Sequence, residues 1–416
     1  MTGGPDTHTE RVRLSAWRFV VWFGVVALFA DVVYEGARSI TGPLLAHLGA
    51  SALVVGVVTG VGETAALLLR LVSGPLADHT GRFWAWTLAG YGLTVVSVPL
   101  LGLASVLWVA GALVIAERVG KAVRSPAKDT LLSHATSVTG RGRGFAVHEA
   151  LDQVGALAGP LSVAAVLALT HDDYAPALLM LAVPGAIAMV LVVWLRVRVP
   201  DPVAYEVPSA PAVTPAPAEE PAELPVAEAA PSRLPRTFWL YATFAGITTA
   251  GFSTFGVLSF HLVTAGLMSA AAVPVLYAAV MVIDAVAAVA TGWAYDRYGA
   301  GVLVVLPVVA AVVPALAFSG TVSVAVAGAL AWGTALGVQE STLRATVADL
   351  VGSGRRATAY GVLGAIIGVG AAAGGALAGG LYDVSVPLLV LVTVALQGVA
   401  LVVLVASLRS RRSTRA

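Results

Sequence analysis

The sequence contains no cysteine among its 416 residues, and only 11% of its residues are charged. The absence of cysteine excludes disulfides, iron–sulfur clusters and thiol catalysis. The scarcity of charge argues against an ordinary soluble fold, in which about a quarter of the residues are charged. Hydrophobic residues instead make up 58% of the chain, and its mean hydropathy is +0.89. A soluble protein of this composition would aggregate, so we expect the chain to lie in a lipid bilayer.

A strong net charge is also missing, because 24 Lys and Arg residues balance 23 Asp and Glu residues to a net charge of +1. No overall electric field therefore points to nucleic acid as a partner. The seven histidines are scattered, and the zinc-protease pattern His-Glu-x-x-His does not occur. With no nucleophile or metal-ligand constellation in the sequence, we expect no metal, no cofactor and no enzymatic activity.

The apolar residues fall in long runs, each of a length that can cross the hydrocarbon layer as a helix. The alternating ten-residue segments of an outer-membrane barrel are missing, so helices are expected rather than strands. The pattern predicts an all-α membrane protein with twelve transmembrane helices. Their expected ranges are 17–41, 52–73, 84–104, 107–131, 143–168, 174–196, 237–264, 272–293, 302–319, 322–349, 356–382 and 386–408.

One long polar segment, from Pro200 to Arg236, separates the first six expected spans from the last six. It is rich in Pro, Ala and Glu and has no apolar period, which is typical of a solvated tether. The expected domains are therefore a cytoplasmic N-terminal tail (1–16), an N-terminal six-helix bundle (17–198), a disordered cytoplasmic linker (199–236), a C-terminal six-helix bundle (237–408) and a basic cytoplasmic tail (409–416).

The positions of the basic residues predict how the helices are oriented. Lys and Arg gather in the loops of one side, at positions such as Arg82, Arg143, Arg198 and Arg356, and the loops of the other side hold essentially none. Cytoplasmic loops carry such an excess. We therefore expect a multi-pass protein of the cytoplasmic (inner) membrane with both termini in the cytoplasm.

The spacing Gly-x-x-x-Asp-x-x-Gly follows both the second and the eighth expected span. Its residues are Gly74, Asp78 and Gly81, followed by Arg82, in the first half, and Gly292, Asp296, Arg297 and Gly299 in the second. A second pair of patterns, Arg124 to Asp129 and Arg344 to Asp349, recurs in the same order near the ends of the fourth and tenth spans. Two repeated patterns in one order indicate an internal duplication.

With these motifs the chain resembles the major facilitator superfamily, whose hallmark is a Gly-x-x-x-Asp-x-x-Gly-Arg loop between helices two and three. The resemblance implies two pseudo-symmetric six-helix bundles and secondary transport of a small molecule by alternating access. In that family the loop is a conformational latch, whose Asp binds a basic residue and a helix end of the other half in the outward-open state. Asp78 and Arg82 would form the main latch here, and Asp296 and Arg297 its partial copy.

Two further patterns resemble motifs of the same family. The run Glu-Arg118-Val-Gly-Lys in the fourth span is similar to a motif whose buried Arg is implicated in proton coupling. The run Gly155-x-x-x-Gly159-Pro160 in the fifth span resembles the antiporter motif of the family's exporters, although the glycines expected after it are missing. The resemblance thus favours export of a drug or metabolite by proton antiport. A proton-coupled uptake symporter and a non-transporting sensor are the alternatives.

Ionisable residues within the expected spans are candidates for the chemistry, because a charge at the bilayer centre costs at least about 2.5 kcal/mol. Three of them share one face of the first span, because Asp31, Glu35 and Arg38 are spaced at i, i+4 and i+7. We expect Asp31 or Glu35 to carry the proton and Arg118 to be its counter-charge. The candidates for proton coupling and the substrate cavity are Asp31, Glu35, Arg38, Glu63, Arg118, Glu149, Asp152, Asp284 and Glu340. Static charge pairing between helices is the alternative for each of them.

Aromatic residues of the second half are candidates for the opposite wall of a cavity. They are Phe244, Phe252 and Phe255 on the seventh span and Tyr277 on the eighth. An apolar wall that faces a charged one would suit an amphipathic or weakly basic solute. The expected partners are thus a small-molecule substrate and the lipid bilayer, with the proton gradient as the energy source and the monomer as the functional unit.

Overall fold

The computed structural model describes residues 14–206, 234–352 and 355–415, and every element in these ranges is a helix. Ten stretches are long and apolar enough to cross a membrane. One of them, Ala272–Ala317, contains two helices, and the helix Leu107–Thr139 is missing from the ten because its apolar part carries several charges. The described residues therefore hold the twelve expected spans, and the all-α prediction is confirmed.

The N-terminal half contains six spans built from eight helices. They are α1 (Ala16–His47), α2 (Ala52–Leu68), α3 (Arg70–Thr80), α4 (Phe83–Gly102), α5 (Leu107–Thr139), α6 (Arg141–Leu169), α7 (Tyr174–Leu179) and α8 (Ala182–Arg198). Serine side chains cap the first two helices: Ser15 accepts from the Arg18 amide and Ser51 from the Val54 amide, each at 3.4 Å. The second span bends at Leu69, where α2 ends and α3 begins.

The C-terminal half repeats this plan. Its elements are α9 (Arg236–Ala250), α10 (Phe255–Thr264), α11 (Ala272–Tyr298), the short 3-10 helix η2 (Gly299–Val304), α12 (Val305–Ala317), α13 (Val322–Leu350), α14 (Arg356–Val384) and α15 (Val386–Arg415). The seventh span is broken between α9 and α10, and Thr254 caps the second piece by accepting from the Val257 amide at 3.4 Å. The break places non-helical backbone inside the bundle.

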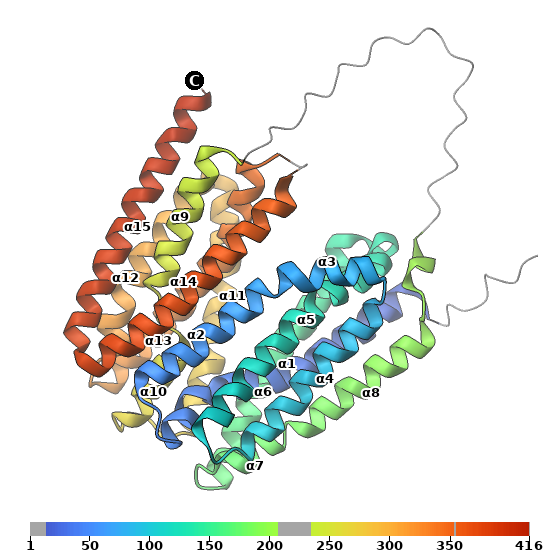
Figure 1. The fold of residues 1–416 in the computed structure, drawn as a ribbon, viewed down its shortest axis with the longest axis horizontal. Coiled ribbons are helices and arrows are strands. Elements are labelled where there is room, and N and C mark those ends of the chain that lie inside the picture. The colour runs from blue at the N-terminus through green and yellow to red at the C-terminus, as the bar shows by residue number, and fades with distance from the viewer. Residues whose placement is uncertain (1–13, 207–233, 353–354, 416) are drawn as a thin grey trace, which may run out of the picture.

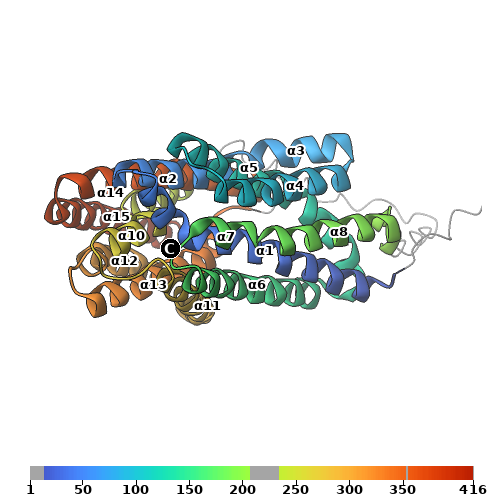
Figure 2. The same cartoon turned by 90° about the horizontal axis from the view of Figure 1, so that it is seen from below.

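The two halves meet at one end of the molecule and diverge towards the other (Figure 1). They touch mainly where α2 packs on α14 and α1 packs on α10. We call this the closed end; it carries the turns at residues 48–51 and 265–271. The other end is the open end; it carries the start of α9 (Figure 1) and the turn between α3 and α4 (Figures 1 and 2).

Glycines allow α2 and α14 to approach until their backbones touch. A Cβ added to Gly56 would overlap the carbonyl oxygen of Gly375, and one added to Gly379 would overlap that of Ala52. Small residues permit such close helix packing within membranes. The contact at the closed end therefore depends on the absence of side chains at these positions.

Two predicted domain boundaries differ from the structure. The expected linker begins with an ordered 3-10 helix, η1 (Pro202–Tyr205), whose Tyr205 hydroxyl donates to the Leu14 carbonyl at 2.8 Å. This helix packs on the first half because Tyr205 buries its ring against Phe19. The remainder of the linker, 207–233, and residues 1–13 of the tail lie outside the described residues. At the other terminus, the expected tail from 409 continues α15 to Arg415.

Candidate functional site

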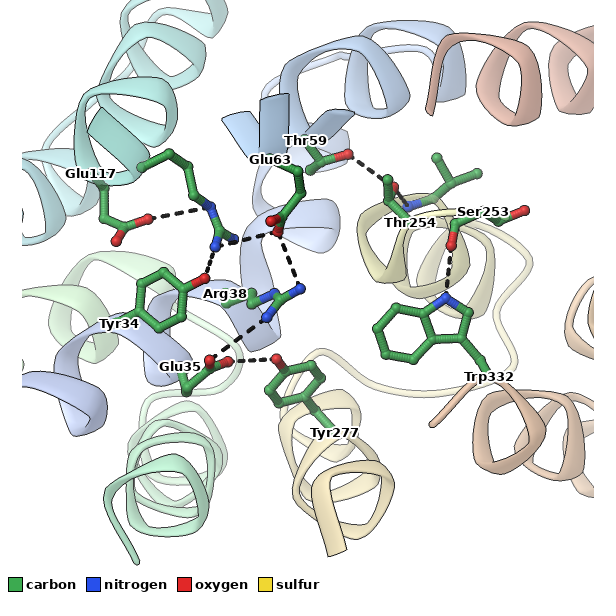
Figure 3. Close-up of polar contacts among 12 residues, drawn as sticks. Tyr34, Glu35, Arg38, Thr59, Glu63, Glu117, Ser253, Thr254, Tyr277 and Trp332 are labelled. Carbon is green, nitrogen blue, oxygen red and sulfur yellow. Dashed lines mark hydrogen bonds and ion pairs between the residues drawn. The ribbon is translucent and has the colours of Figure 1, made fainter. Parts of the chain in front are cut away.

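A cavity of about 680 Å³ lies between the two halves. Helices α1, α2, α3 and α5 form one wall, and α13, α14 and the break between α9 and α10 form the other. At its deep side the hydroxyls of Thr59 and Thr254 lie 2.9 Å apart, across the two halves (Figure 3). Towards the open end the cavity reaches Leu71 and Tyr360, which are both exposed. It is therefore accessible from the open end.

The N-terminal wall carries a chain of ion pairs (Figure 3). Arg38 of α1 lies 3.1 Å from Glu63 of α2 and 3.6 Å from Glu35 of its own helix. Arg118 of α5 lies 3.4 Å from Glu63 and 3.4 Å from Glu117. The Glu63 carboxylate thus bridges two guanidinium groups from different helices.

One hydrogen bond extends this network into the other half. The Tyr277 hydroxyl of α11 donates to Oε2 of Glu35 at 2.5 Å (Figure 3). Tyr277 is fully buried, and its ring packs against Phe255 with 4.6 Å between centroids. Any movement of the two halves against each other must therefore stretch or break a bond to Glu35.

A further cation, Lys121 of α5, lines the same wall and forms no ion pair with another described residue. Its Nζ lies 3.6 Å from the centre of the Tyr34 ring, and the Tyr34 hydroxyl accepts a hydrogen bond from Arg118. Within the described part of the chain, no carboxylate lies within 4 Å of this ammonium group, and the group donates no hydrogen bond. Lys121 therefore contacts an aromatic face directly, and the carboxylates of Asp31 and Glu35 act on it from farther away.

Five of the nine candidate charges lie in this ion-pair network or line the cavity, and the other four do neither. Glu35 and its partners Arg38, Glu63 and Arg118 form the network described above, and Glu340 lines the cavity from the C-terminal half. The other four candidates, Asp31, Glu149, Asp152 and Asp284, are absent from the cavity lining.

Each of those four residues has a different environment. Asp31 is buried within the N-terminal half, 3.8 Å from Arg124. Asp284 is buried on α11, and among the described residues its Oδ1 has no hydrogen-bond partner. Asp152 is half-buried on α6, whereas Glu149 is exposed and accepts only a long hydrogen bond from Gln153 at 3.5 Å. Glu149 is thus accessible to solvent, and its role in an internal site stays a prediction.

The C-terminal wall is aromatic, but not with all the residues expected. Phe252 and Trp332 stack with 5.5 Å between centroids and 3° between planes, and Phe255 lies 5.6 Å from Trp332. The Trp332 indole donates to the Ser253 carbonyl at 2.7 Å, which fixes the ring (Figure 3). Phe244 instead packs in the core of the C-terminal half. No sequence pattern singles out Trp332, because a lone Trp in an apolar span is typical of a core residue.

The residues of the expected latch lie at the open end. Gly74 to Asp78 belong to α3 rather than to a loop, and only Gly81, with φ at +60°, makes the turn. Asp78 and Arg82 are exposed, and in the described residues neither forms an ion pair. The latch interpretation expects Asp78 to be apart from the other half when the cavity is open at the end that carries this motif.

The partial copy of the latch has the same arrangement in the second half. Gly292 to Asp296 lie within α11, and Gly299, with φ at +68°, ends that helix. The Arg297 guanidinium lies over the rings of Trp293 and Tyr298, at 6.0 and 5.7 Å. Its charge is thus placed at the surface among aromatic rings, as membrane-interface cations are.

The antiporter-like residues determine how closely α6 packs on α1. A Cβ added to Gly155 would overlap the carbonyl oxygen of Leu28, and one added to Gly159 would overlap that of Val32. Pro160 follows within α6, where it removes one helical hydrogen bond. These residues therefore hold α6 directly against the helix that carries Asp31 and Glu35.

Carboxylates from each half cap a helix of the other half at the closed end. Asp383, at the end of α14, accepts from the amides of Ala52 and Leu53 at 3.2 and 2.9 Å, at the start of α2. Asp172, which follows α6, accepts from the Ala271 amide at 2.9 Å, at the start of α11. The two sites occupy equivalent places in the two halves, and we refer to them as the cross-half caps.

Comparison with known proteins identifies the family. Residues 23–375 match the family model of the Major Facilitator Superfamily. The chain belongs to this superfamily. It is 63% identical over 401 residues to an uncharacterised protein of Mycobacterium tuberculosis, covering 95% of this chain and 94% of the relative. It is also 27% identical over 186 residues to an uncharacterised MFS-type transporter of Methanocaldococcus jannaschii, covering 44% and 46% of the two chains.

The fold of this chain is also found in solved transporter structures. The crystal structure of the nucleoside transporter NupG superposes with a TM-score of 0.70 at 13% identity, covering 94% of this chain and 98% of that one. Identity this low supports the fold and not the substrate. The predicted family and fold are confirmed, and the protein is a multi-pass membrane transporter that works by alternating access.

Proposed function

We propose that this MFS transporter exports a small molecule from the cytoplasm in exchange for protons, and that Glu35 carries the proton. The observation that supports this most strongly is the position of Glu35 between the two halves. Its carboxylate is paired with Arg38 on its own helix and accepts from Tyr277 on the other half. The proton gradient is the only energy source that this proposal requires.

Rocking of the halves would change the surroundings of Glu35. Cations and hydrogen-bond donors favour a carboxylate over a carboxylic acid. When the halves move, Tyr277 moves with α11, whereas Arg38 stays with α1. The carboxyl group then has a different proton affinity in each state, and a ligand that distinguishes two states shifts the balance between them. Arg118 is the counter-charge in this proposal, since it reaches Glu35 through Glu63 and Arg38.

Asp31 is a weaker candidate for the same role. Its partner Arg124 lies on α5 of the same half, so rocking does not separate the pair. A charge pair of this kind fixes the contact between α1 and α5, which is the static alternative for buried charges. Neutralising Asp31 is therefore expected to affect packing more than coupling.

Export is supported by the antiporter-like residues of α6, and the orientation is supported by the basic residues. Arg82, Arg198, Arg236 and Arg356 belong to turns and helix termini of the open end. Basic residues mark the cytoplasmic side. We therefore place the open end and both termini in the cytoplasm of an inner-membrane protein that acts as a monomer. In this orientation the cavity faces the cytoplasm, ready to take up a molecule for export.

Inverted membrane vesicles test the coupling. A growth-inhibition panel on cells with and without the protein first identifies exported compounds. In vesicles with an acid interior, such a compound should dissipate the pH gradient only when the protein is present. Glu35→Gln should abolish this proton exchange while one-for-one exchange of the compound across the membrane persists. Asp31→Asn should slow both processes together.

Glu149→Gln is the matched control, since it neutralises an exposed carboxylate on α6 and should leave proton exchange unchanged. If Glu35→Gln still exchanged protons at the rate of the unaltered protein, Glu35 would not be the carrier. If adding the compound instead made the vesicle interior more acid, because the compound entered together with protons, the protein would be an uptake symporter.

A further inference from the structure

The cavity is lined by more cations than carboxylates. Four cationic side chains contribute to it, namely Arg38, Arg70, Arg118 and Lys121, against two carboxylates, Glu63 and Glu340. Glu63 is shared by Arg38 and Arg118, which also pair with Glu35 and Glu117 behind the lining. Lys121 has neither ion pair nor hydrogen bond to its ammonium group within the described residues. The carboxylates of Asp31 and Glu35 act on Lys121 from beyond 4 Å. An anion that comes within hydrogen-bond distance of its ammonium group would gain the direct contact that they do not make.

The facing wall offers a rigid aromatic surface. Trp332 and Phe252 are stacked in parallel, and the indole is fixed through its hydrogen bond to the Ser253 carbonyl. Aromatic faces favour contact with flat apolar groups. The volume of about 680 Å³ lies within the range of pockets that take a drug-sized molecule. A ligand that spans the cavity therefore meets a cation on one side and aromatic rings on the other.

We propose that the cavity binds an organic anion with a flat apolar part. Lys121 holds the anionic group, and Phe252, supported by the buried Trp332 ring, contacts the apolar part. The cations of the lining replace the expectation of a weakly basic solute, because a cationic solute would face Lys121, whose ammonium group has no carboxylate within 4 Å among the described residues. This substrate class rests on the proposed transport function and specifies the molecule that the same cavity carries.

Binding to the purified full-length protein, measured by calorimetry, tests the substrate class. Three probes share one flat ring system and differ in charge: 1-naphthoate, neutral 1-naphthol and the 1-naphthylmethylammonium cation. We expect 1-naphthoate to bind at least about tenfold more tightly than the cation. Lys121→Gln should weaken 1-naphthoate about tenfold and leave 1-naphthol unchanged, because only the anion loses a charged partner. Lys121→Arg should restore most of the affinity.

Two further variants separate binding from folding. Lys128→Gln removes a cation from the same helix that is absent from the cavity lining, and should bind all three probes normally. Trp332→Leu should weaken 1-naphthoate and 1-naphthol alike, and Trp332→Phe, which keeps a ring, should weaken them less.

The proposal is overturned if the cation binds most tightly, or if Lys121→Gln and Lys128→Gln weaken 1-naphthoate equally. In either case the unaltered protein should still exchange protons in inverted vesicles, so only the substrate class would be wrong. If the unaltered protein bound 1-naphthoate as expected but exchanged no protons, the proposed coupling would be wrong instead.

Discussion

A single phenol hydroxyl joins the charged network of one half to the other half. Tyr277→Phe removes the hydrogen bond to Glu35 but keeps the ring that packs on Phe255. A hydrogen bond to a charged group contributes about 1.5–3 kcal/mol, so its loss should shift the balance away from the state open at the open end by tenfold or more. Proton exchange should persist with an altered pH dependence, measured as its rate in vesicles over a range of pH.

Tyr241→Phe is the control for that change. It also removes a buried hydroxyl from the C-terminal half, but the lost hydrogen bond, to the Leu343 carbonyl, lies within that half. It should leave the pH dependence of exchange unaltered. An equal effect of both substitutions would mean that the hydroxyl of Tyr277 acts only on the stability of its own half.

The candidate site could be predicted from the sequence where helical spacing decides it. Glu35 and Arg38 were expected on one helix face, and the structure places both in the network. Spacing does not report which charges of different helices meet, so Glu149 was grouped with Glu35 although it is exposed. Lys121 stands out only once its surroundings are known, because what distinguishes it is that no described carboxylate lies within 4 Å of its ammonium group. Trp332 depends in the same way on the stacking of Phe252.

At the scale of elements, the contact between α2 and α14 determines whether the closed end can close. Gly56→Ala would place a methyl group against the Gly375 carbonyl oxygen, and backbone atoms at that point cannot rotate away. The two helices should move apart, so the closed end should open and transport should fall. Gly398→Ala is the control, since nothing lies within 4 Å of an added Cβ there.

Spin labels can measure this opening directly, because the chain has no native cysteine to compete with introduced ones. His47→Cys and Ala265→Cys place labels on exposed positions of the two halves at the closed end. The distance between them should lengthen in Gly56→Ala and stay unchanged in Gly398→Ala. An unchanged distance in Gly56→Ala would show that α2 and α14 accommodate the methyl group without separating.

Element positions were predictable from hydropathy, whereas element breaks were not. The expected span 107–131 is present as α5 even though its charges weaken the apolar signal. The bend at Leu69 is followed by Arg70, and the break before Thr254 falls in the run Thr-Thr-Ala-Gly-Phe-Ser-Thr that ends at Thr254, but hydropathy averaged over a whole span resolves neither. For the same reason Gly74 to Asp78 were assigned to a loop, although they continue α3 to Thr80. Tertiary packing, and not local propensity, decides such interruptions.

At the scale of the whole molecule, acidic residues at the two ends are expected to join the halves in different conformational states. The cross-half caps of Asp383 and Asp172 join the halves at the closed end in the state described here. Asp78, at the open end, forms no ion pair with another described residue in this state, and the family resemblance assigns it a bond to the other half when the open end closes. The two sets would then hold alternative states, and transport would require both to be broken in turn.

This arrangement predicts opposite effects for substitutions at the two ends. Asp383→Ala removes a carboxylate from the start of α2, which costs about 0.5–2 kcal/mol for a helix cap. It should lengthen the distance between labels at residues 47 and 265, since the closed end then opens more often. Asp78→Ala should have the reverse effect, because it weakens only the state in which the open end is closed.

The double substitution Asp78→Ala with Asp383→Ala gives the sharpest test of that balance. The two sites lie at opposite ends and share no partner, so their effects on free energy should add. Opposite effects of similar size should cancel, returning the label distances to those of the unaltered protein and recovering much of the transport that either single change removes. Transport that is lower in the double variant than in both single ones would show that the two sets of contacts do not compete. In that case each Asp would stabilise its own half, and the equilibrium between states would depend on other contacts.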